Sequence, residues 1–118
     1  MNDHNLGLEF DPPSTGPAVL RVIGELDHHT APLLREALDS VSLSPGDGYV
    51  LDLSRLEYCD STGVTVLVTA LRKAEAAEGR LCLAGLSREL TRVFHLIGLG
   101  DVFSLHDTVE QAIECQRS

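Results

Sequence analysis

At 118 residues the chain is the size of one domain, with room for one hydrophobic core but not for two. Hydrophobic residues make up 43% of it and charged residues 23%, which is typical of a globular protein; aromatic residues make up only 4%, so we expect an aliphatic core. The formal net charge of -9 argues against binding to nucleic acid or to an anionic membrane surface, because both would repel it, and leaves a basic protein partner open.

The first third of the chain has the pattern strand, break, strand and helix. Residues 6–10 alternate weakly and indicate an edge strand, and the prolines and glycine within 12–17 then interrupt regular structure. The β-branched stretch 18–23 predicts a buried strand. A helix over 30–43 follows, with Thr30 as its expected N-cap residue.

The rest of the chain repeats this alternation. Apolar residues at strand or helix spacing predict further strands at 49–53, 80–84 and 102–105 and further helices at 62–78, 87–97 and 107–115. The intervals are too short for anything but βαβ-type crossovers, so we predict an α/β fold with a small mixed sheet. The central strands of that sheet are expected to be 18–23, 49–53 and 80–84.

Neither a membrane span nor a secretion signal is predicted. The longest mostly apolar segment is 63–71, which is too short to cross a bilayer, and residues 1–10 lack a basic region followed by a hydrophobic one. Cys59, Cys82 and Cys115 form no Cys-x-x-Cys pair, which indicates buried thiols in a reducing compartment. We therefore expect a cytoplasmic protein.

The most informative segment is 58–64, which joins a buried strand to a helix. A helix start has unpaired N–H groups and the positive end of the helix dipole, so it favours an anion. Ser61 therefore has two interpretations: the N-cap residue of the helix, or a place where a phosphate would be tolerated. Gly63 leaves the backbone uncovered, so that another protein could approach closely.

A second segment, 24–30, also joins a strand to a helix, and we expect both loops at the same edge of the sheet. Asp27, His28 and His29 suggest a metal site, but adjacent histidines on an extended loop point in different directions, so we predict a polar turn without metal or other cofactor. A catalytic triad using Ser61 is disfavoured because the sequence lacks the G-x-S-x-G elbow. The sequence also lacks the P-loop and G-x-G-x-x-G motifs of nucleotide-binding proteins.

The stretch 24–31 (Gly-Glu-Leu-Asp-His-His-Thr-Ala), followed by Asp-Ser-Thr-Gly at 60–63, resembles the STAS domain of anti-sigma factor antagonists, in particular the SpoIIAA-like sporulation group and its general-stress relatives. The Leu-Ser-Arg-Glu-Leu run at 86–90 also fits. The resemblance covers about residues 6–115 of a single domain spanning 1–118. It implies a four- or five-stranded sheet with helices packed on one side.

The resemblance implies a partner switch rather than an enzyme. The unphosphorylated protein would bind an anti-sigma factor that is also a serine kinase, and this binding would free a sigma factor. The kinase would then phosphorylate Ser61 and be released, and a metal-dependent serine phosphatase would reset the switch. No catalytic residue is implied in this chain, and the implied partner-binding residues are Asp27, His28, Asp60, Thr62, Gly63 and Val64.

One position departs from the family pattern. Many members have Gly-Leu-Gly after the two hydroxyl residues, whereas this chain has Gly63, Val64 and Thr65. The departure bears on the identity of the kinase more than on the switching chemistry.

Two alternatives stay open at this point. The first is a STAS module that is not regulated by phosphorylation, used as a scaffold in a sensory complex or as a subunit of a lipid or anion transport system. The second is a ligand-binding domain or a small enzyme. Nothing in the sequence suggests an obligate dimer, so we expect a monomer.

Overall fold

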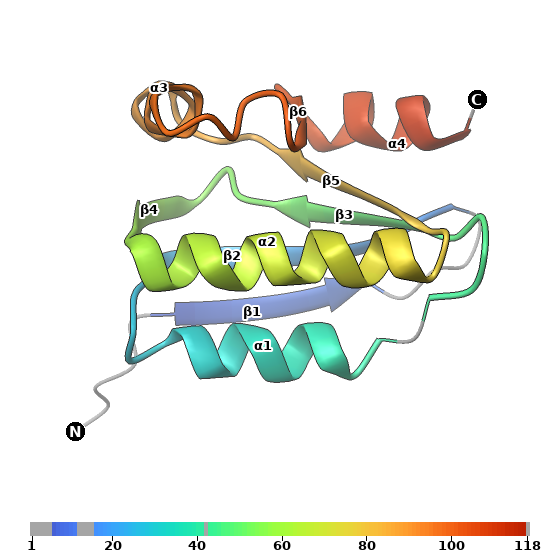
Figure 1. The fold of residues 1–118 in the computed structure, drawn as a ribbon, viewed down its shortest axis with the longest axis horizontal. Coiled ribbons are helices and arrows are strands. Elements are labelled where there is room, and N and C mark those ends of the chain that lie inside the picture. Colours follow the sequence, from blue (N-terminus) through green and yellow to red (C-terminus); the bar gives the residue numbers. More distant parts are fainter. Residues whose placement is uncertain (1–5, 12–15, 42, 118) are drawn as a thin grey trace.

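The computed structural model describes residues 6–11, 16–41 and 43–117 (Figure 1). Within them the chain forms, in order, β1 (Leu6–Asp11), β2 (Ala18–Leu26), α1 (Ala31–Asp39), β3 (Gly48–Asp52), β4 (Leu56–Cys59), α2 (Ser61–Ala76), β5 (Arg80–Ala84), α3 (Arg88–Leu96), β6 (Ser104–His106) and α4 (Val109–Arg117). The predicted alternation of strands and helices is confirmed, and β4 is an additional strand. None of these described helices is long and apolar enough to span a membrane.

The strands form one mixed sheet in the order β1-β2-β3-β5-β6. β1 is an edge strand, as predicted, and pairs antiparallel with β2; the other pairs are parallel. β3 lies beside the first residues of β2, and β4 lies beside its last residues, so that β3 and β4 occupy one flank of β2 in succession. The carboxyl ends of β2, β4 and β5 therefore lie at one edge of the sheet.

The larger core lies between the sheet and the helix pair α1 and α2. Alternate strand residues point to this face, and Leu20, Leu51 and Leu83 are at most 1% exposed. They belong to one cluster with Leu34 of α1 and Leu67 of α2, which are also fully buried. Each such leucine stabilises the fold by about 1.5–3 kcal/mol relative to an exposed one.

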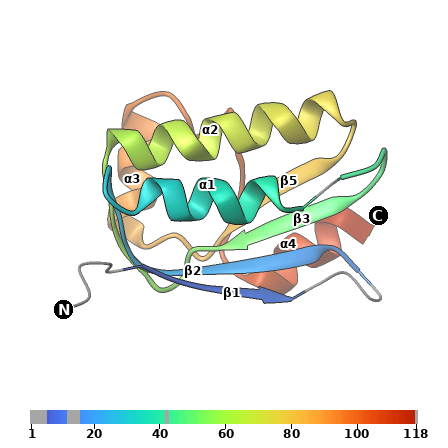
Figure 2. The same cartoon turned by 90° about the horizontal axis from the view of Figure 1, so that it is seen from below.

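The opposite face of the sheet is covered by α4 (Figure 2). Here Val19, Val50 and Cys82 pack with Ala112 of the helix. The α/β class is thus confirmed, but two details differ from expectation: helices pack on both faces, and the described part of the sheet has six strands rather than four or five. The physical reason for the first is that β2, β3 and β5 carry apolar residues at consecutive positions, and both faces must be shielded from water.

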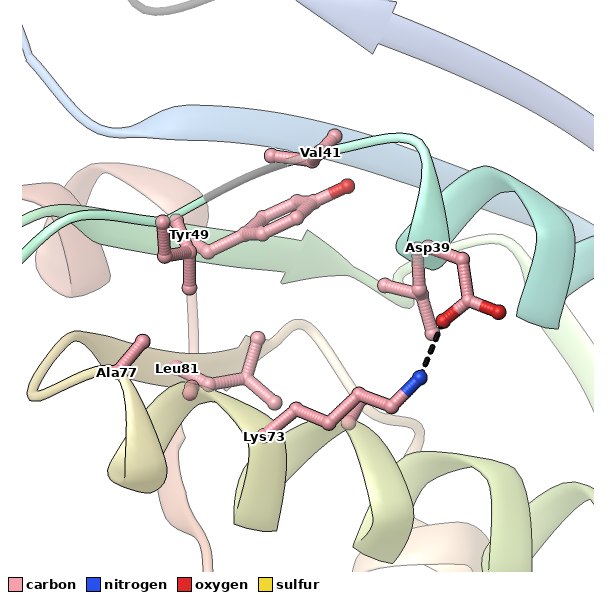
Figure 3. A pocket seen from close by; sticks show the side chains of 10 residues that line it. Asp39, Val41, Tyr49, Lys73, Ala77 and Leu81 are labelled. Carbon is pink, nitrogen blue, oxygen red and sulfur yellow. Dashed lines mark hydrogen bonds and ion pairs between the residues drawn. The ribbon is translucent and has the colours of Figure 1, made fainter.

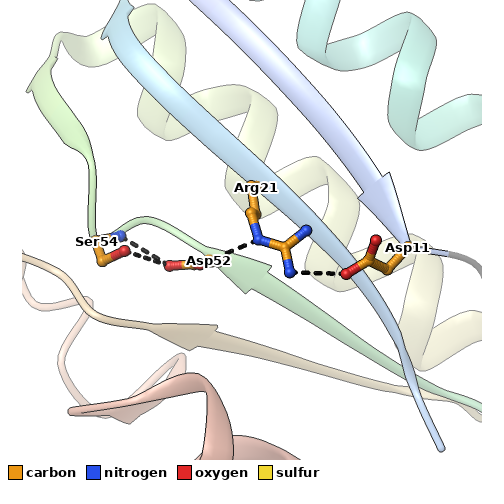
Figure 4. A network of polar contacts seen from close by, with 4 residues as sticks. All are labelled: Asp11, Arg21, Asp52 and Ser54. Atoms are coloured by element: carbon orange, nitrogen blue, oxygen red, sulfur yellow. Dashed lines mark hydrogen bonds and ion pairs between the residues drawn. The ribbon is translucent and has the colours of Figure 1, made fainter.

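Arg21 links three strands on this second face (Figure 4). Its guanidinium pairs with Asp11 of β1 at 2.7 Å and with Asp52 of β3 at 3.9 Å. Asp52 Oδ1 also accepts hydrogen bonds from the amide and the hydroxyl of Ser54, which turns the chain from β3 toward β4. Because Arg21 and Asp11 are substantially exposed, their pair contributes roughly 0–1 kcal/mol and mainly favours the observed register.

Candidate functional site

Two loops meet at the carboxyl edge of the sheet. One leads from β2 into α1, and the other leads from β4 into α2. Because β2 and β4 pair in parallel, the loops leave the sheet side by side, and the backbone amide of Asp60 donates a hydrogen bond to the carbonyl of Leu26 over 3.1 Å. The prediction that segments 24–30 and 58–64 share one edge is therefore confirmed.

The Asp27 carboxylate shapes the first loop from within. Its Oδ1 accepts hydrogen bonds from the backbone amides of Thr30 at 3.0 Å and His29 at 2.9 Å. The bond from the Thr30 amide, assisted by that from His29, holds the pKa of Asp27 below its ordinary value, because both bonds favour the charged carboxylate. The neighbouring His28 is exposed, as is His29, so both histidine side chains of this loop are accessible.

Thr30 occupies the N-cap position of α1, as predicted, but its hydroxyl does not cap the helix. The residue is 1% exposed and has φ -97° and ψ -18°, unlike the extended conformation typical of a capping residue. Its Oγ1 donates to the carbonyl of Glu25 at 2.8 Å and accepts from the amide of Asp27 at 2.9 Å. The buried hydroxyl thus closes the loop back onto the end of β2.

Asp60, rather than Ser61, caps α2, so the interpretation of Ser61 as the N-cap residue is wrong. Asp60 is extended, with φ -96° and ψ -175°, and its Oδ1 accepts a hydrogen bond from the amide of Gly63 at 3.0 Å. Ser61 is the first residue of the helix and is exposed, whereas Thr62 is half-buried. The serine side chain is therefore accessible and is not needed as the N-cap.

Gly63 packs against the ends of β2 and β4. It is buried, and a Cβ atom at this position would lie 2.7 Å from Cγ of Leu26 and 2.9 Å from Sγ of Cys59. Such distances are too short for real carbon contacts, so the close approach of α2 to β2 and β4 requires glycine. The missing side chain serves packing within the chain, and the assignment of Gly63 to a partner-binding surface stays a prediction.

The next turn of α2 contains the departure from the family pattern. Val64 is half-buried against the larger core, so only part of it faces outward. Thr65 is exposed, and its Oγ1 donates a hydrogen bond to the carbonyl of Ser61 at 2.9 Å. A hydroxyl that a glycine would lack therefore contacts the backbone of the candidate phosphoacceptor.

The site offers no thiolate nucleophile. Burial, with a smaller contribution from the charge of Asp60, raises the pKa of Cys59 to about 12. The thiol is consequently protonated at neutral pH.

The two adjacent histidines lie side by side. The rings of His28 and His29 are 4.0 Å apart and tilted by 38°, and both residues are exposed. Among the described residues no group of three His, Cys, Asp or Glu side chains is arranged to hold a metal ion. The absence of a metal in the working protein stays a prediction.

The sequence interpretation missed an apolar surface on α3 and the turn after it. The sequence predicts a helix over 87–97 with Leu90, Val93, Phe94 and Ile97 on the inside, but Phe94 is the buried member in this described helix. Val93 and Ile97 are 43% and 54% exposed, and Leu96 is 76% exposed. Figure 1 shows α3 at the same end of the molecule as the start of α2. The sequence does contain a signal for this exposed apolar surface, because residues 93–97 include more apolar side chains than one buried helix face requires.

Comparison with known proteins gives one consistent family. The model of the STAS domain matches residues 12–112. The anti-sigma-B factor antagonist of Listeria monocytogenes is 35% identical over 101 residues, which cover 86% of this chain and 89% of that protein.

Solved structures agree with this match. The crystal structure of an anti-sigma factor antagonist from Mycobacterium paratuberculosis has a TM-score of 0.84 and 30% identity, covering 96% of this chain and 95% of that one. The Bacillus cell fate determinant SpoIIAA in its phosphorylated form has a TM-score of 0.70 and 27% identity, covering 92% and 98%. SpoIIAA in its unphosphorylated form has a TM-score of 0.75 and 29% identity, covering 94% and 96%.

Proposed function

This chain belongs to the STAS domain family, and we propose that it acts as an anti-sigma factor antagonist that is switched by phosphorylation of Ser61. Relatives that it covers almost completely are named anti-sigma factor antagonists, and one of them has been solved in a phosphorylated and an unphosphorylated form. In this proposal the chain is a binding module that works in the cytoplasm and has no catalytic residues.

The observation that carries the proposal is the exposure of Ser61 at the first position of α2. A kinase must reach the hydroxyl that it modifies, and Ser61 is exposed whereas the adjacent Thr62 is half-buried. Since Asp60 provides the cap, the serine hydroxyl can change without removing the bond that starts the helix. These features favour Ser61 over Thr62 as the acceptor.

A phosphate here would change binding more than folding. The positive end of the helix dipole favours an anion at the first turn, so the helix can accept the group. The phosphate adds about -1.5 to -2 charge to an edge that already carries the carboxylates of Asp27 and Asp60. Within a protein interface this charge would lose its hydration, which weakens binding unless a cation of the partner pairs with it. A coupling of about 1–3 kcal/mol between phosphorylation and partner binding would change the affinity for the partner roughly 5–150-fold.

We assign the partner surface to both loops. The anti-sigma factor, itself a serine kinase, would contact Asp27, His28, Asp60, Thr62, Gly63 and Val64. Its binding would release the sigma factor, and a metal-dependent serine phosphatase would remove the phosphate. Because Asp27 also holds its own loop, its replacement by asparagine tests the contribution of charge to binding better than replacement by alanine, which removes the hydrogen-bond acceptor as well.

The first experiment identifies the partner and then tests the switch. Tagged Ser61→Ala chain is used to capture proteins from the native lysate, and the captured kinase is identified by mass spectrometry. The purified kinase and ATP are then added to the wild type, to Ser61→Ala and to the matched control Thr62→Ala. We expect phosphate on the wild type and on Thr62→Ala, and none on Ser61→Ala.

Calorimetry on the same proteins measures the consequence. Ser61→Ala should bind the kinase as tightly as the unphosphorylated wild type, and Ser61→Asp should bind more weakly, though less weakly than the phosphoprotein, because a carboxylate carries less charge. Phosphate found on Thr62, or an affinity that phosphorylation leaves unchanged, would overturn the proposal.

A further inference from the structure

The groove between α1 and α2 contains a cavity that the proposed function does not use (Figure 3). Tyr49 of β3 and Leu81 of β5 line it from the sheet, and the end of α1 and the second half of α2 line it from above. Its volume is about 160 Å³. An engineered apolar cavity of about 150 Å³ in another protein binds benzene, so this volume suits one small ring.

A second, larger hollow of about 280 Å³ adjoins the first along the same groove. The two share Leu38, Asp39, Ala70 and Lys73 as lining residues, so they lie next to each other between the helices. Ser61 lies at the opposite end of α2 from the first cavity, and the inference therefore does not rest on the proposed phosphorylation.

The hydroxyl of Tyr49 indicates a ligand. Tyr49 is 3% exposed, and among the described residues its Oη has no hydrogen-bond partner. In Figure 3 the ring reaches from β3 toward Val41 and the end of α1, within the set of side chains that line the cavity. Burial raises the pKa of Tyr49 to about 12, so the group stays neutral and can both donate and accept a hydrogen bond. A buried hydroxyl is normally paired, and no described residue pairs with this one.

The rest of the cavity lining favours an uncharged ligand, because it is mostly aliphatic. Aliphatic side chains such as Val41, Leu81 and Ala77 surround the tyrosine, and the charged lining residues are Asp39 and Lys73, which form an ion pair between α1 and α2. Their side chains are 46% and 61% exposed. A pair exposed to this degree is held weakly and can open without great cost.

We propose that this cavity binds a small neutral molecule with an apolar body about the size of a benzene ring and one hydroxyl or carbonyl group that pairs with Tyr49 Oη. The apolar body lies against Val41 and Leu81. The ion pair between Asp39 and Lys73 lies at the exposed side of the cavity and opens for entry.

Phenol and toluene are the matched probes, because they have similar size and differ in the hydroxyl. Each is titrated into the full-length ¹⁵N-labelled chain, and amide shifts are followed by NMR. We expect saturable shifts around the end of α1 and the second half of α2. Tyr49→Phe should weaken phenol binding about five-fold, the effect of one hydrogen bond, and should leave toluene binding unchanged.

Two alanines of α2 provide the second test. Ala70 lines both hollows, whereas Ala76 is exposed on the same helix and lines neither. Ala70→Leu should fill the groove and abolish the binding of both probes, and Ala76→Leu should bind them as the wild type does. Thermal melts confirm that each variant is folded.

Three outcomes would overturn the proposal: no saturable binding of phenol to the wild type, equal weakening of phenol and toluene by Tyr49→Phe, or undiminished binding to folded Ala70→Leu. The first would mean that the hydroxyl pairs only with water. If Ala70→Leu does not fold, the comparison of phenol and toluene on Tyr49→Phe decides alone.

Discussion

Replacing Thr30 by valine should destabilise the fold through the loss of one buried hydroxyl. Valine has nearly the same shape, so the change leaves little cavity and removes the hydrogen bonds to the carbonyl of Glu25 and from the amide of Asp27. Thr30 is 1% exposed, so water cannot readily replace the hydroxyl at these groups. Serine is the matched control, since it keeps the hydroxyl and loses the methyl group.

The magnitude follows from the two bonds. Removing the hydroxyl from this part-buried donor and acceptor costs about 1–3 kcal/mol for each group, and we take about 2–3 kcal/mol for the two together. For a chain of this length 1 kcal/mol corresponds to about 4 °C in Tm, so Thr30→Val should melt roughly 8–12 °C below the wild type. Thr30→Ser loses one buried methyl group, about 1 kcal/mol or roughly 4 °C.

Thermal unfolding followed by circular dichroism distinguishes these values. NMR shifts of the amides of Asp27 and His29 then report whether the loop itself has changed. A Thr30→Val protein that melts within about 2 °C of the wild type, or a serine variant that is the less stable of the two, would refute the reasoning, because the hydroxyl would then not be what holds the loop.

Three further predictions concern the same edge. Because folding lowers the pKa of Asp27, the charged carboxylate stabilises the fold above the unfolded pKa of about 3.9, and this contribution is lost as pH falls through the folded pKa. The difference in Tm between wild type and Asp27→Asn should therefore shrink below about pH 4 in melts from pH 7 to 2. Gly63→Ala should lower the free energy of unfolding by about 1–2 kcal/mol in urea titrations, since the clash with fully buried Leu26 outweighs the helix propensity gained, and equal stability would contradict the packing role. Iodoacetamide at pH 8 should modify exposed Cys115 well before Cys59, whose pKa is about 12; peptide mapping that finds Cys59 labelled first would disprove its burial in solution.

The central strands and the helices could be predicted because each has a strong local signal. The stretch 18–23 is apolar apart from Arg21 and rich in β-branched residues, and the apolar residues of 62–78 recur at helical spacing. β4 was missed because Leu56–Cys59 has four residues, of which Glu57 and Tyr58 are exposed, and it is a strand through its pairing with β2. Such pairing depends on distant residues and leaves little local pattern.

The capping residues show where local preference stops being decisive. Asp60 and Ser61 are both good N-cap residues, so their order along the chain does not say which one is used. Tertiary contacts decide: the Asp60 amide binds the carbonyl of Leu26, and this fixes the extended backbone from which its carboxylate reaches Gly63. The position of α4, in contrast to the capping residue, does have a signal in the sequence. The continuous apolar runs in β2 and β3 indicate strands that are shielded on both faces.

In the proposed function, the two loops divide structural and signalling roles between adjacent residues. Asp27, Thr30, Asp60 and Gly63 each make a contact that fixes the edge, so changing any of them alters its shape as well as any binding surface. Ser61 is exposed beside them, and its side chain provides no N-cap. Exposed positions without such contacts usually change stability by less than about 0.5 kcal/mol when substituted. A modification at Ser61 can therefore act on a partner with little effect on folding, which is the property that a reversible switch requires.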